Sequence, residues 1–160
     1  GRQFPVWQHR GLKFAVLICS DGGYSEPARI LALKGARVIF APHFNYIRDT
    51  GLLSHFTKVR ADHTARASEN NVYFVRGNNV VLDPAKNGIT RNEGVGYGDS
   101  YIMDPGGEIL VRSRRQVEDF ITAEVETDFP QNKSWGLSKS AWSWREFHSH
   151  VEAAIKSTTD

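Results

Sequence analysis

The segment Lys13-Phe-Ala-Val-Leu-Ile-Cys-Ser-Asp-Gly-Gly-Tyr-Ser-Glu-Pro27 decides the fold class. Its first half, Lys13–Cys19, is apolar without polar alternation after the first residue, which is typical of a strand covered on both faces. Ser20-Asp-Gly-Gly23 interrupts that run. Ser25 then has the chemistry of a helix N-cap, and the proline two residues later suits a first turn. We therefore expect a strand, a tight turn and a helix that ends near Lys34.

A second buried strand is expected at Ala36–Ala41, where valine and isoleucine are frequent. A strand, a helix and another apolar strand form a βαβ unit, which is parallel and right-handed in nearly all known folds. A long helix is expected at Leu53–Asn70 and a third strand at Val72–Val81, with an irregularity at Asn78-Asn79. This half of the chain therefore predicts an α/β sheet.

The chain beyond residue 98 has a different pattern. Strands are expected at Ser100–Met103, Glu108–Ser113 and Asp119–Val125, and the first two are joined by the turn sequence Asp104-Pro-Gly-Gly107. A polar, glycine-containing loop at Asp83–Gly98 precedes them, and such loops often line sites. These segments predict a strand meander that completes a mixed sheet.

Composition excludes several classes of protein. The chain has 160 residues, 40% of them hydrophobic and 24% charged, which is typical of one globular domain. A net charge of +2 gives no reason to expect a nucleic-acid partner. The longest apolar run is far shorter than the roughly 20 residues that span a bilayer, so no membrane association is expected. A single cysteine and no leader segment favour a cytoplasmic location.

The composition shifts after Asp128, where tryptophans appear among serine, lysine and glycine. Residues 1–128 are expected to form one domain, and residues 129–160 an aromatic arm with a helix at about Ala141–Lys156. An arm of this kind packs on a neighbouring subunit, which favours a homo-oligomer. The alternative, that the arm folds back on its own sheet, stays open.

Cys19 is the residue at which the sequence indicates chemistry. It ends a buried strand of an open α/β sheet, and sites in such sheets form at the carboxyl ends of the strands. A helix start beside a cysteine favours its thiolate form. The backbone N–H of Ser20 is placed to bind an oxyanion formed when that thiolate attacks a carbonyl or nitrile carbon. The alternative is a buried structural cysteine.

The segment from Cys19 to Glu26 resembles the nucleophile segment of the nitrilase superfamily of carbon–nitrogen hydrolases. In that family an acidic residue follows the cysteine by two positions, as Asp21 does here, and a Pro-Glu pair closes the loop. Glu26 matches that glutamate, Ser25 stands where the proline is usual, and Arg29 matches a common arginine.

Further matches follow in the family's order. They are Gly35-Ala-Arg-Val-Ile-Phe-Ala-Pro42, Ala65-Arg-Ala-Ser-Glu-Asn70 with Asn71-Val-Tyr-Phe-Val, Gly98-Asp-Ser100, and Asp104-Pro-Gly-Gly107. Each motif is weak alone, but the ordered set covers roughly residues 4–126 and is specific.

The resemblance implies half of a four-layer αββα sandwich, with a mixed sheet flanked by helices, to which the composition of residues 129–160 adds a C-terminal helical arm. Family members use a Glu–Lys–Cys triad, and the glutamate and lysine lie upstream of the segment that this chain represents. The chain opens at Gly1 without methionine. We therefore expect a truncation or proteolytic product, or a chain that pairs with its missing N-terminal half, since a lone half exposes a sheet face.

By the same resemblance, the substrate is a small amide, N-carbamoyl compound or nitrile, with amidase or carbamoylase chemistry preferred, and no metal or organic cofactor is implied. Loops at the carboxyl ends of the first two strands offer four candidate pocket residues, which are Tyr24, His43, Phe44 and Asn45. Asp21 and Glu26 are expected to cap and hydrogen-bond the turn. Glu69 is expected to pair with Arg29 or Arg66 rather than act in catalysis.

Other interpretations carry less weight. A cysteine–histidine dyad using His43, His55 or His63 is discounted, because families of that type place histidine directly after the cysteine. The histidine spacing does not fit a metal site. Gly94-Val-Gly-Tyr-Gly98 is expected to be a flexible loop rather than a phosphate cradle, and Arg112-Ser-Arg-Arg115 a solvated strand edge. A catalytically inactive interaction module and a thiol redox sensor remain the functional alternatives.

Overall fold

A six-stranded mixed sheet forms the centre of the computed structural model, which describes residues 3–81, 83, 85, 94–129 and 144–157. The sheet order is β1-β2-β3-β4-β7-β8, and β5 and β6 form a separate pair. The strands are β1 (Trp7–His9), β2 (Leu12–Val16), β3 (Val38–His43), β4 (Tyr73–Asn78), β5 (Val80–Val81), β6 (Gly96–Tyr97), β7 (Tyr101–Met103) and β8 (Ile109–Arg112). The helices are η1 (Cys19–Gly23), α1 (Ser25–Leu33), η2 (Asp49–Gly51), α2 (Leu52–Asn70) and α3 (Trp144–Ser157).

The parallel centre of the sheet is the predicted βαβ unit. β2 pairs with β3 and β3 with β4, both parallel, and the register sets Val38 opposite Phe14 on one side and Tyr73 on the other. The outer strands β1, β7 and β8 pair antiparallel with their neighbours. The mixed sheet flanked by helices is therefore confirmed.

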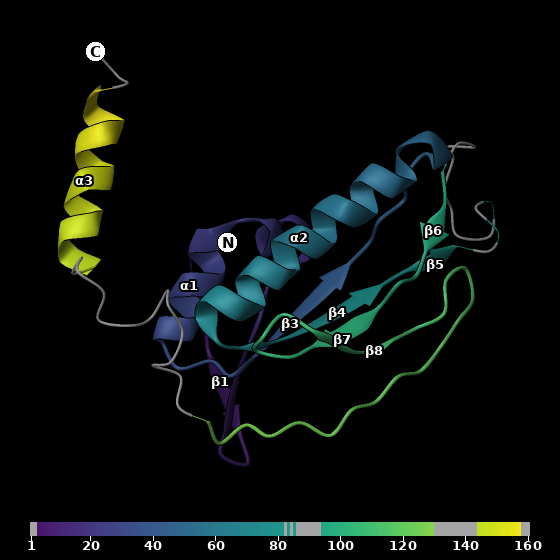
Figure 1. The fold of residues 1–160 in the computed structure, drawn as a ribbon, viewed down its shortest axis with the longest axis horizontal. Helices are drawn as coiled ribbons and strands as arrows, with labels where there is room; N and C mark the ends of the chain where they lie inside the picture. The colour runs from purple at the N-terminus through teal and green to yellow at the C-terminus, as the bar shows by residue number, and fades with distance from the viewer. Residues whose placement is uncertain (1–2, 82, 84, 86–93, 130–143, 158–160) are drawn as a thin grey trace.

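One face of the sheet carries the core. Ala15, Ile39, Ala41 and Phe74 alternate with residues on the opposite face and are fully buried. Helices α1 and α2 lie over this face, as Figure 1 shows. The opposite face has no helix in the described part of the chain and will be called the open face.

The β7–β8 hairpin forms as the turn sequence predicts. The Asp104 N–H donates to the Glu108 carbonyl at 2.9 Å, and the Asp104 Oδ1 accepts from the Gly106 and Glu108 N–H groups. Gly107 has φ +91°, a conformation that favours glycine, and an added Cβ would lie 2.8 Å from Thr64 Cγ2 on α2.

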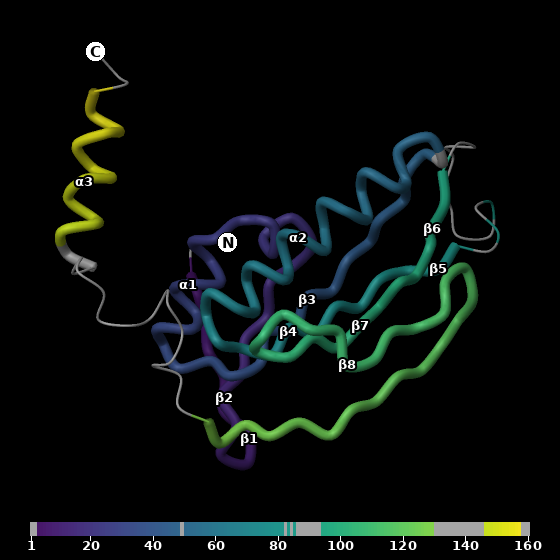
Figure 2. Tube along the Cα trace, viewed as in Figure 1, coloured from purple at the N-terminus to yellow at the C-terminus, as the bar shows by residue number. Residues whose placement is uncertain are grey.

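The expected irregularity at Asn78-Asn79 is confirmed, because β4 ends at Asn78 and the chain resumes as β5 after one residue. The expectation of a flexible loop at Gly94–Gly98 is wrong. Within it, β6 pairs with β5, and Val95 bridges Ile47 at the start of the α2 region, which Figure 2 shows as neighbouring tubes. Glycine is required at Gly96, where a Cβ would lie 2.5 Å from Val81 Cγ2.

Two further expectations need correction. Asp119–Val125 is not a strand, because residues 119–125 make no ladder in the structure. The segment instead runs extended along the open face, where Asp119, Phe120 and Ile121 help to line a groove of about 430 Å³. Ser25 is the first residue of α1 rather than its N-cap, and the N-cap is Tyr24, without a side-chain hydrogen bond.

The carboxy-terminal helix α3 begins at Trp144 in the described residues, and the predicted start at Ala141 lies outside them. Side chains from residue 146 to 157 are exposed, among them Phe147, Val151 and Ile155. In Figure 1 α3 stands apart from the sheet. The division at residue 128 stays a prediction. None of the helices that the structure describes is long and apolar enough to cross a bilayer.

Candidate active site

Cys19 lies just past the carboxyl end of β2, at the first residue of η1. It is a half-buried free thiol. The strand direction continues to Leu17, whose N–H donates to the Phe40 carbonyl at 2.9 Å. Cys19 itself has φ +52°, in the left-handed region that non-glycine residues rarely adopt. Strained backbone of this kind clusters at functional sites, because the surrounding structure must hold it in place.

The turn after Cys19 is a short 3₁₀ helix rather than the direct start of α1. The Asp21 N–H donates to the Ile18 carbonyl at 3.1 Å, and the Tyr24 N–H to the Asp21 carbonyl at 3.4 Å. The first N–H groups of a helix have no partner within that helix, and the Ser20 N–H belongs to this set. The geometry is therefore compatible with an oxyanion at Ser20, although the donor comes from η1 and not from α1.

The carboxylates beside the turn are exposed. Asp21 and Glu26 are both on the surface, and the N-caps of η1 and α1 carry no side-chain hydrogen bond. Among the hydrogen bonds of the described residues, none uses either carboxylate. The turn is held by main-chain bonds and by packing, so the capping role expected for these two side chains is not seen.

Glu69, near the carboxyl end of α2, contacts Arg29 of α1. The Arg29 Nη1 donates to the Glu69 carbonyl at 2.7 Å, and its Nη2 lies 3.5 Å from Glu69 Oε2. Arg66 forms an ion pair with Glu69 Oε1. Burial lowers the pKa of Arg29, and the Glu69 carboxylate opposes that effect. Both arginines named from the sequence contact Glu69; the Arg29 contacts join α1 to α2, and the Arg66 pair lies within α2.

The four predicted pocket residues differ in their surroundings. Tyr24 and Phe44 are exposed, 63% and 59% respectively. His43 is half-buried, and its Nδ1 lies 2.7 Å from the Ala41 carbonyl. Asn45 is buried, and its N–H donates to the side-chain oxygens of Asn78 and Asn79. Lining of a pocket stays a prediction for all four, but Asn45 has a visible role in holding the loop after β3.

Arg76 is a buried hub that the sequence analysis did not single out. Its Nη2 donates to Asn45 Oδ1 at 2.7 Å and to the Tyr97 hydroxyl at 2.9 Å, and its Nη1 donates to the carbonyls of Gly98 and Asp99. The available signal was an arginine at an inward position of an otherwise apolar strand.

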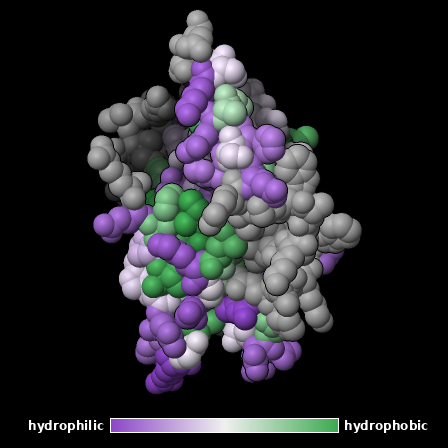
Figure 3. All heavy atoms as spheres, turned by 90° about the vertical axis from the view of Figure 1, so that its left-hand side faces the viewer, coloured by the Kyte–Doolittle hydropathy of each residue, from purple (hydrophilic) through white to green (hydrophobic). Residues whose placement is uncertain are grey.

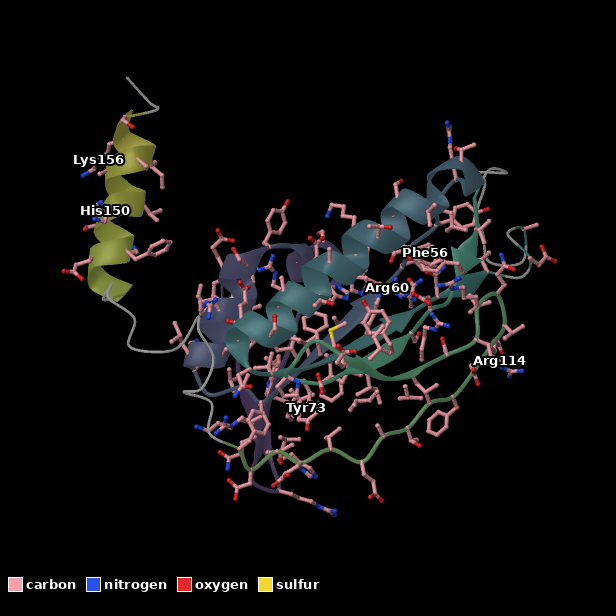
Figure 4. All side chains as sticks on the ribbon, in the orientation of Figure 1. Phe56, Arg60, Tyr73, Arg114, His150 and Lys156 are labelled. Carbon is pink, nitrogen blue, oxygen red and sulfur yellow. The ribbon has the colours of Figure 1, made fainter. Side chains whose placement is uncertain are left out.

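A cluster of ion pairs around Asp99 lies next to the hydrogen bonds of Arg76. The buried Asp99 carboxylate accepts from Arg60 Nη2 at 2.8 and 3.0 Å and from Arg115 Nε at 3.3 Å. Phe56 and Arg60 lie one turn apart on the same side of α2 in Figure 4, and the Phe56 ring packs on Tyr97. Arg115, which was expected at a solvated strand edge, therefore forms an ion pair with the buried Asp99 carboxylate.

Two histidines lie together near the turn that follows Cys19. The rings of His43 and His63 are 5.1 Å apart between centroids, and His63 Nδ1 lies 2.7 Å from the Tyr101 hydroxyl. Burial lowers the pKa of His43 to about 4, and burial followed by repulsion from His43 lowers that of His63 to about 2. Burial also raises the pKa of Tyr101. The imidazoles are therefore neutral at ordinary pH.

A metal centre finds no support in the described part of the chain, where no three histidine, cysteine, aspartate or glutamate side chains gather as ligands. The chemistry that the arrangement offers is that of a thiol beside backbone donors.

The amino-acid sequence matches a known protein family. The family model for carbon-nitrogen hydrolase matches residues 1–131. The chain belongs to the carbon–nitrogen hydrolase family. It is 31% identical over 140 residues to N-carbamoylputrescine amidase of Arabidopsis thaliana and 29% identical over 140 residues to citrullinase of Francisella tularensis. Each match covers 84% of this chain and 46% of the relative, so the chain spans about half the length of these carbon–nitrogen hydrolases.

Solved structures of the family share the fold. A carbon-nitrogen hydrolase from Helicobacter pylori aligns with a TM-score of 0.64 at 21% identity, over 71% of this chain and 40% of that protein. A variant of an amidase from Nesterenkonia, with acrylamide added at its active-site cysteine, aligns with a TM-score of 0.60 at 20% identity, over 94% of this chain and 50% of the amidase. The nitrilase-type architecture expected from the sequence is thereby confirmed.

Proposed function

We propose that this chain is the nucleophile-bearing half of a thiol hydrolase that cleaves non-peptide carbon–nitrogen bonds, with Cys19 as the nucleophile. The observation that carries the proposal is a half-exposed free cysteine with φ +52° at the carboxyl end of a parallel strand. A strained turn that presents a nucleophile at a strand end is a recurrent catalytic device. The amidases among the relatives support the reaction class.

The reaction on an amide follows from these groups. The Cys19 thiolate forms a bond to the carbonyl carbon, and the carbonyl electron pair moves to oxygen, where the Ser20 N–H donates a hydrogen bond. Collapse of this intermediate breaks the C–N bond, and the amine leaves with a proton from the acid form of the base. Water then attacks the thioester, releases the carboxylic acid and restores the thiol.

We propose that the base for this reaction comes from outside the described residues. The histidines nearest the turn, His43 and His63, are too weakly basic at neutral pH to remove a thiol proton efficiently. No hydrogen bond or ion pair of the Cys19 side chain occurs among residues that the structure describes. The glutamate and lysine that the family resemblance implies are therefore expected from an amino-terminal half of the fold.

The open face is where we propose that this half packs. Its apolar side chains include Phe14, Val16, Val75 and the 40% exposed Phe40, and they line or adjoin the 430 Å³ groove. A sheet face of this composition is normally covered by another layer. We propose that the second sheet of the αββα sandwich covers it. The exposed apolar side chains of α3 are proposed to contact another subunit.

For the substrate we propose a small N-carbamoyl compound, because the names of two relatives, N-carbamoylputrescine amidase and citrullinase, point to carbamoyl groups. Attack on the carbamoyl carbon expels ammonia, and water then releases the remainder as amine and carbon dioxide. The thiol must be reduced at the start of each turnover, which favours a reducing compartment such as the cytoplasm.

The test compares residues 1–160 alone with the longer protein encoded by the full open reading frame that contains them. We expect iodoacetamide to alkylate Cys19 in both, and ammonia to be released from N-carbamoyl amines only by the longer protein. Cys19→Ser in the longer protein is expected to abolish ammonia release while leaving the fold intact. Full ammonia release by that variant would overturn the proposal.

The main alternative is an interaction module without activity. The exposed open face and the exposed side chains of α3 favour it as the second candidate. It predicts a slow, unactivated alkylation of Cys19 and no ammonia release by the longer protein, so the same experiment separates the two functions.

A further inference from the structure

The left-handed conformation of Cys19 requires support from its surroundings, and the turn has little of its own. No side chain caps η1, which rests on main-chain hydrogen bonds across three residues. A left-handed non-glycine residue is less stable than an extended one and persists only where packing holds it. The packing partner of η1 is therefore part of what presents the thiol.

That partner is the side of α2 that faces the turn. Gly22 is buried, and a Cβ placed there would lie 3.4 Å from His63 Nε2 and 3.4 Å from Phe74 Cζ. These are ordinary van der Waals distances, so η1 packs directly against the imidazole edge of His63 and the ring of Phe74. His63 presents its polar edge to Gly22, whereas the half-buried neighbour Gly23 lies near Asp62 Oδ2 and Lys58 Nζ of the same helix.

His63 is itself held in one orientation. Its ring lies between Phe74, at 4.4 Å between centroids, and His43, at 5.1 Å. In the described chain, Nδ1 is the only acceptor recorded for the Tyr101 hydroxyl, at 2.7 Å. Tyr101 is fully buried and needs an acceptor for its proton. The hydroxyl therefore donates to Nδ1, which assigns the hydrogen of the neutral ring to Nε2, the nitrogen that faces Gly22.

We propose that His63 is a positioning residue for the nucleophile, and that the Tyr101–His63–Gly22 contact holds Cys19 in the conformation that presents its sulfur and the Ser20 N–H to substrate. This inference rests on the proposed role of Cys19. It assigns His63 no contact with substrate and no proton transfer. His63 acts through packing against η1, from a ring whose angle is set by β7.

The test measures the rate constant for alkylation of Cys19 by iodoacetamide as a function of pH, in residues 1–160 and four variants. His63→Leu removes both ring nitrogens, and His63→Gln restores a polar group near the Nε2 position. Tyr101→Phe removes only the hydroxyl that orients the ring. His55→Leu is the matched control, because His55 is a half-buried histidine of α2 that packs on Tyr97 instead.

For His63→Leu we expect alkylation at pH 7 to slow by about two- to fivefold, with the pH profile displaced to higher pH, because the favourable effect of the turn's N–H groups on the thiolate is lost. His63→Gln is expected to recover at least half of the rate, Tyr101→Phe to fall between, and His55→Leu to match the unchanged protein. Urea unfolding reports whether each variant is folded.

A folded His63→Leu with an unchanged rate and pH profile would overturn the inference, as would His63→Gln behaving like His63→Leu. If His63→Leu does not fold, Tyr101→Phe decides: a displaced profile supports the inference and an unchanged one overturns it. The proposed function fails separately, when Cys19→Ser in the longer protein leaves ammonia release unchanged.

Discussion

Cys19 holds a backbone conformation that glycine adopts without strain and other residues do not. We therefore predict that Cys19→Gly has a free energy of unfolding about 1 kcal/mol higher than Cys19→Ala. Urea denaturation of both variants measures the difference. The matched pair is Ile18→Gly and Ile18→Ala, since Ile18 is extended at φ −93°, and there glycine should be the less stable variant. Equal stabilities at position 19 would show that the conformation carries no strain.

Acid should destabilise the protein through His63. Its pKa in the folded state, about 2, is far below its ordinary value of 6.5, so the unfolded state binds a proton first as the pH falls. The stability contributed by the neutral ring is complete above pH 6.5 and is lost as the pH falls toward 2. Between pH 6 and 4.5 this loss amounts to at most about 2 kcal/mol.

Urea unfolding at several pH values measures this loss. His63→Leu should reduce the slope of the profile to the part that the buried His43 contributes, whereas His9→Leu, at an exposed position of β1, should leave it unchanged. An identical slope in His63→Leu and the unchanged protein would contradict the account.

Strand, turn and helix signals surround Cys19, so the sequence predicts its place at a strand end, and its role as nucleophile stays a prediction. Sequence reasoning did not reach Arg76 or the position of His63, because their importance depends on burial by segments distant in sequence. Tyr101 is 38 positions from His63 and Asn45 is 31 from Arg76. No local pattern predicts such contacts.

The Arg29–Glu69 ion pair joins the elements α1 and α2, and it provides a test of how they are held together. The side chains of Arg29 and Arg66 are 14% and 12% exposed, so Glu69→Ala leaves two largely buried guanidiniums without this carboxylate. We predict a loss of about 1–3 kcal/mol in the free energy of unfolding.

The control for Glu69→Ala is Asp62→Ala, which removes the ion pair with Lys58 one helical turn away on the surface of α2. An exposed pair at this spacing contributes only about 0.5 kcal/mol or less. Equal losses for the two variants would contradict the locking role of Glu69.

Periodicity and turn chemistry predicted most elements, including α2 and the β7–β8 hairpin. They failed at residues 119–125, which have the composition of a strand and lie extended on the open face without a ladder partner. They also failed at Gly94–Gly98, where a glycine-rich stretch becomes the paired β6. In both cases the outcome depends on which strand edge is available, and that is a property of the assembled sheet.

For the whole molecule, the exposed apolar surface is the property that matters most. Figure 3 shows hydrophobic residues gathered among hydrophilic ones on the side of the molecule that lies at the left of Figure 1, and the open face is a separate apolar surface. Phe40 lies on the open face, where we propose that the missing half packs. We predict that residues 1–160 self-associate through this face. Phe40→Arg is expected to weaken the association by about tenfold or more, since it removes an exposed aromatic side chain that the association would bury.

Sedimentation equilibrium measures this association. Leu53→Arg is the matched control, because Leu53 is 78% exposed but lies on α2, away from the open face. The same weakening in both variants would show that the effect is one of charge and that the open face is not the contact.

The most direct test of Cys19 as the nucleophile is mass spectrometry of the protein encoded by the full open reading frame, sampled during turnover of an N-carbamoyl amine. After an acid quench, we predict a covalent adduct with the mass of the acyl group on the peptide that contains Cys19, and no adduct in Cys19→Ser. Ammonia release that continues at an unchanged rate with no adduct on Cys19 would contradict the account.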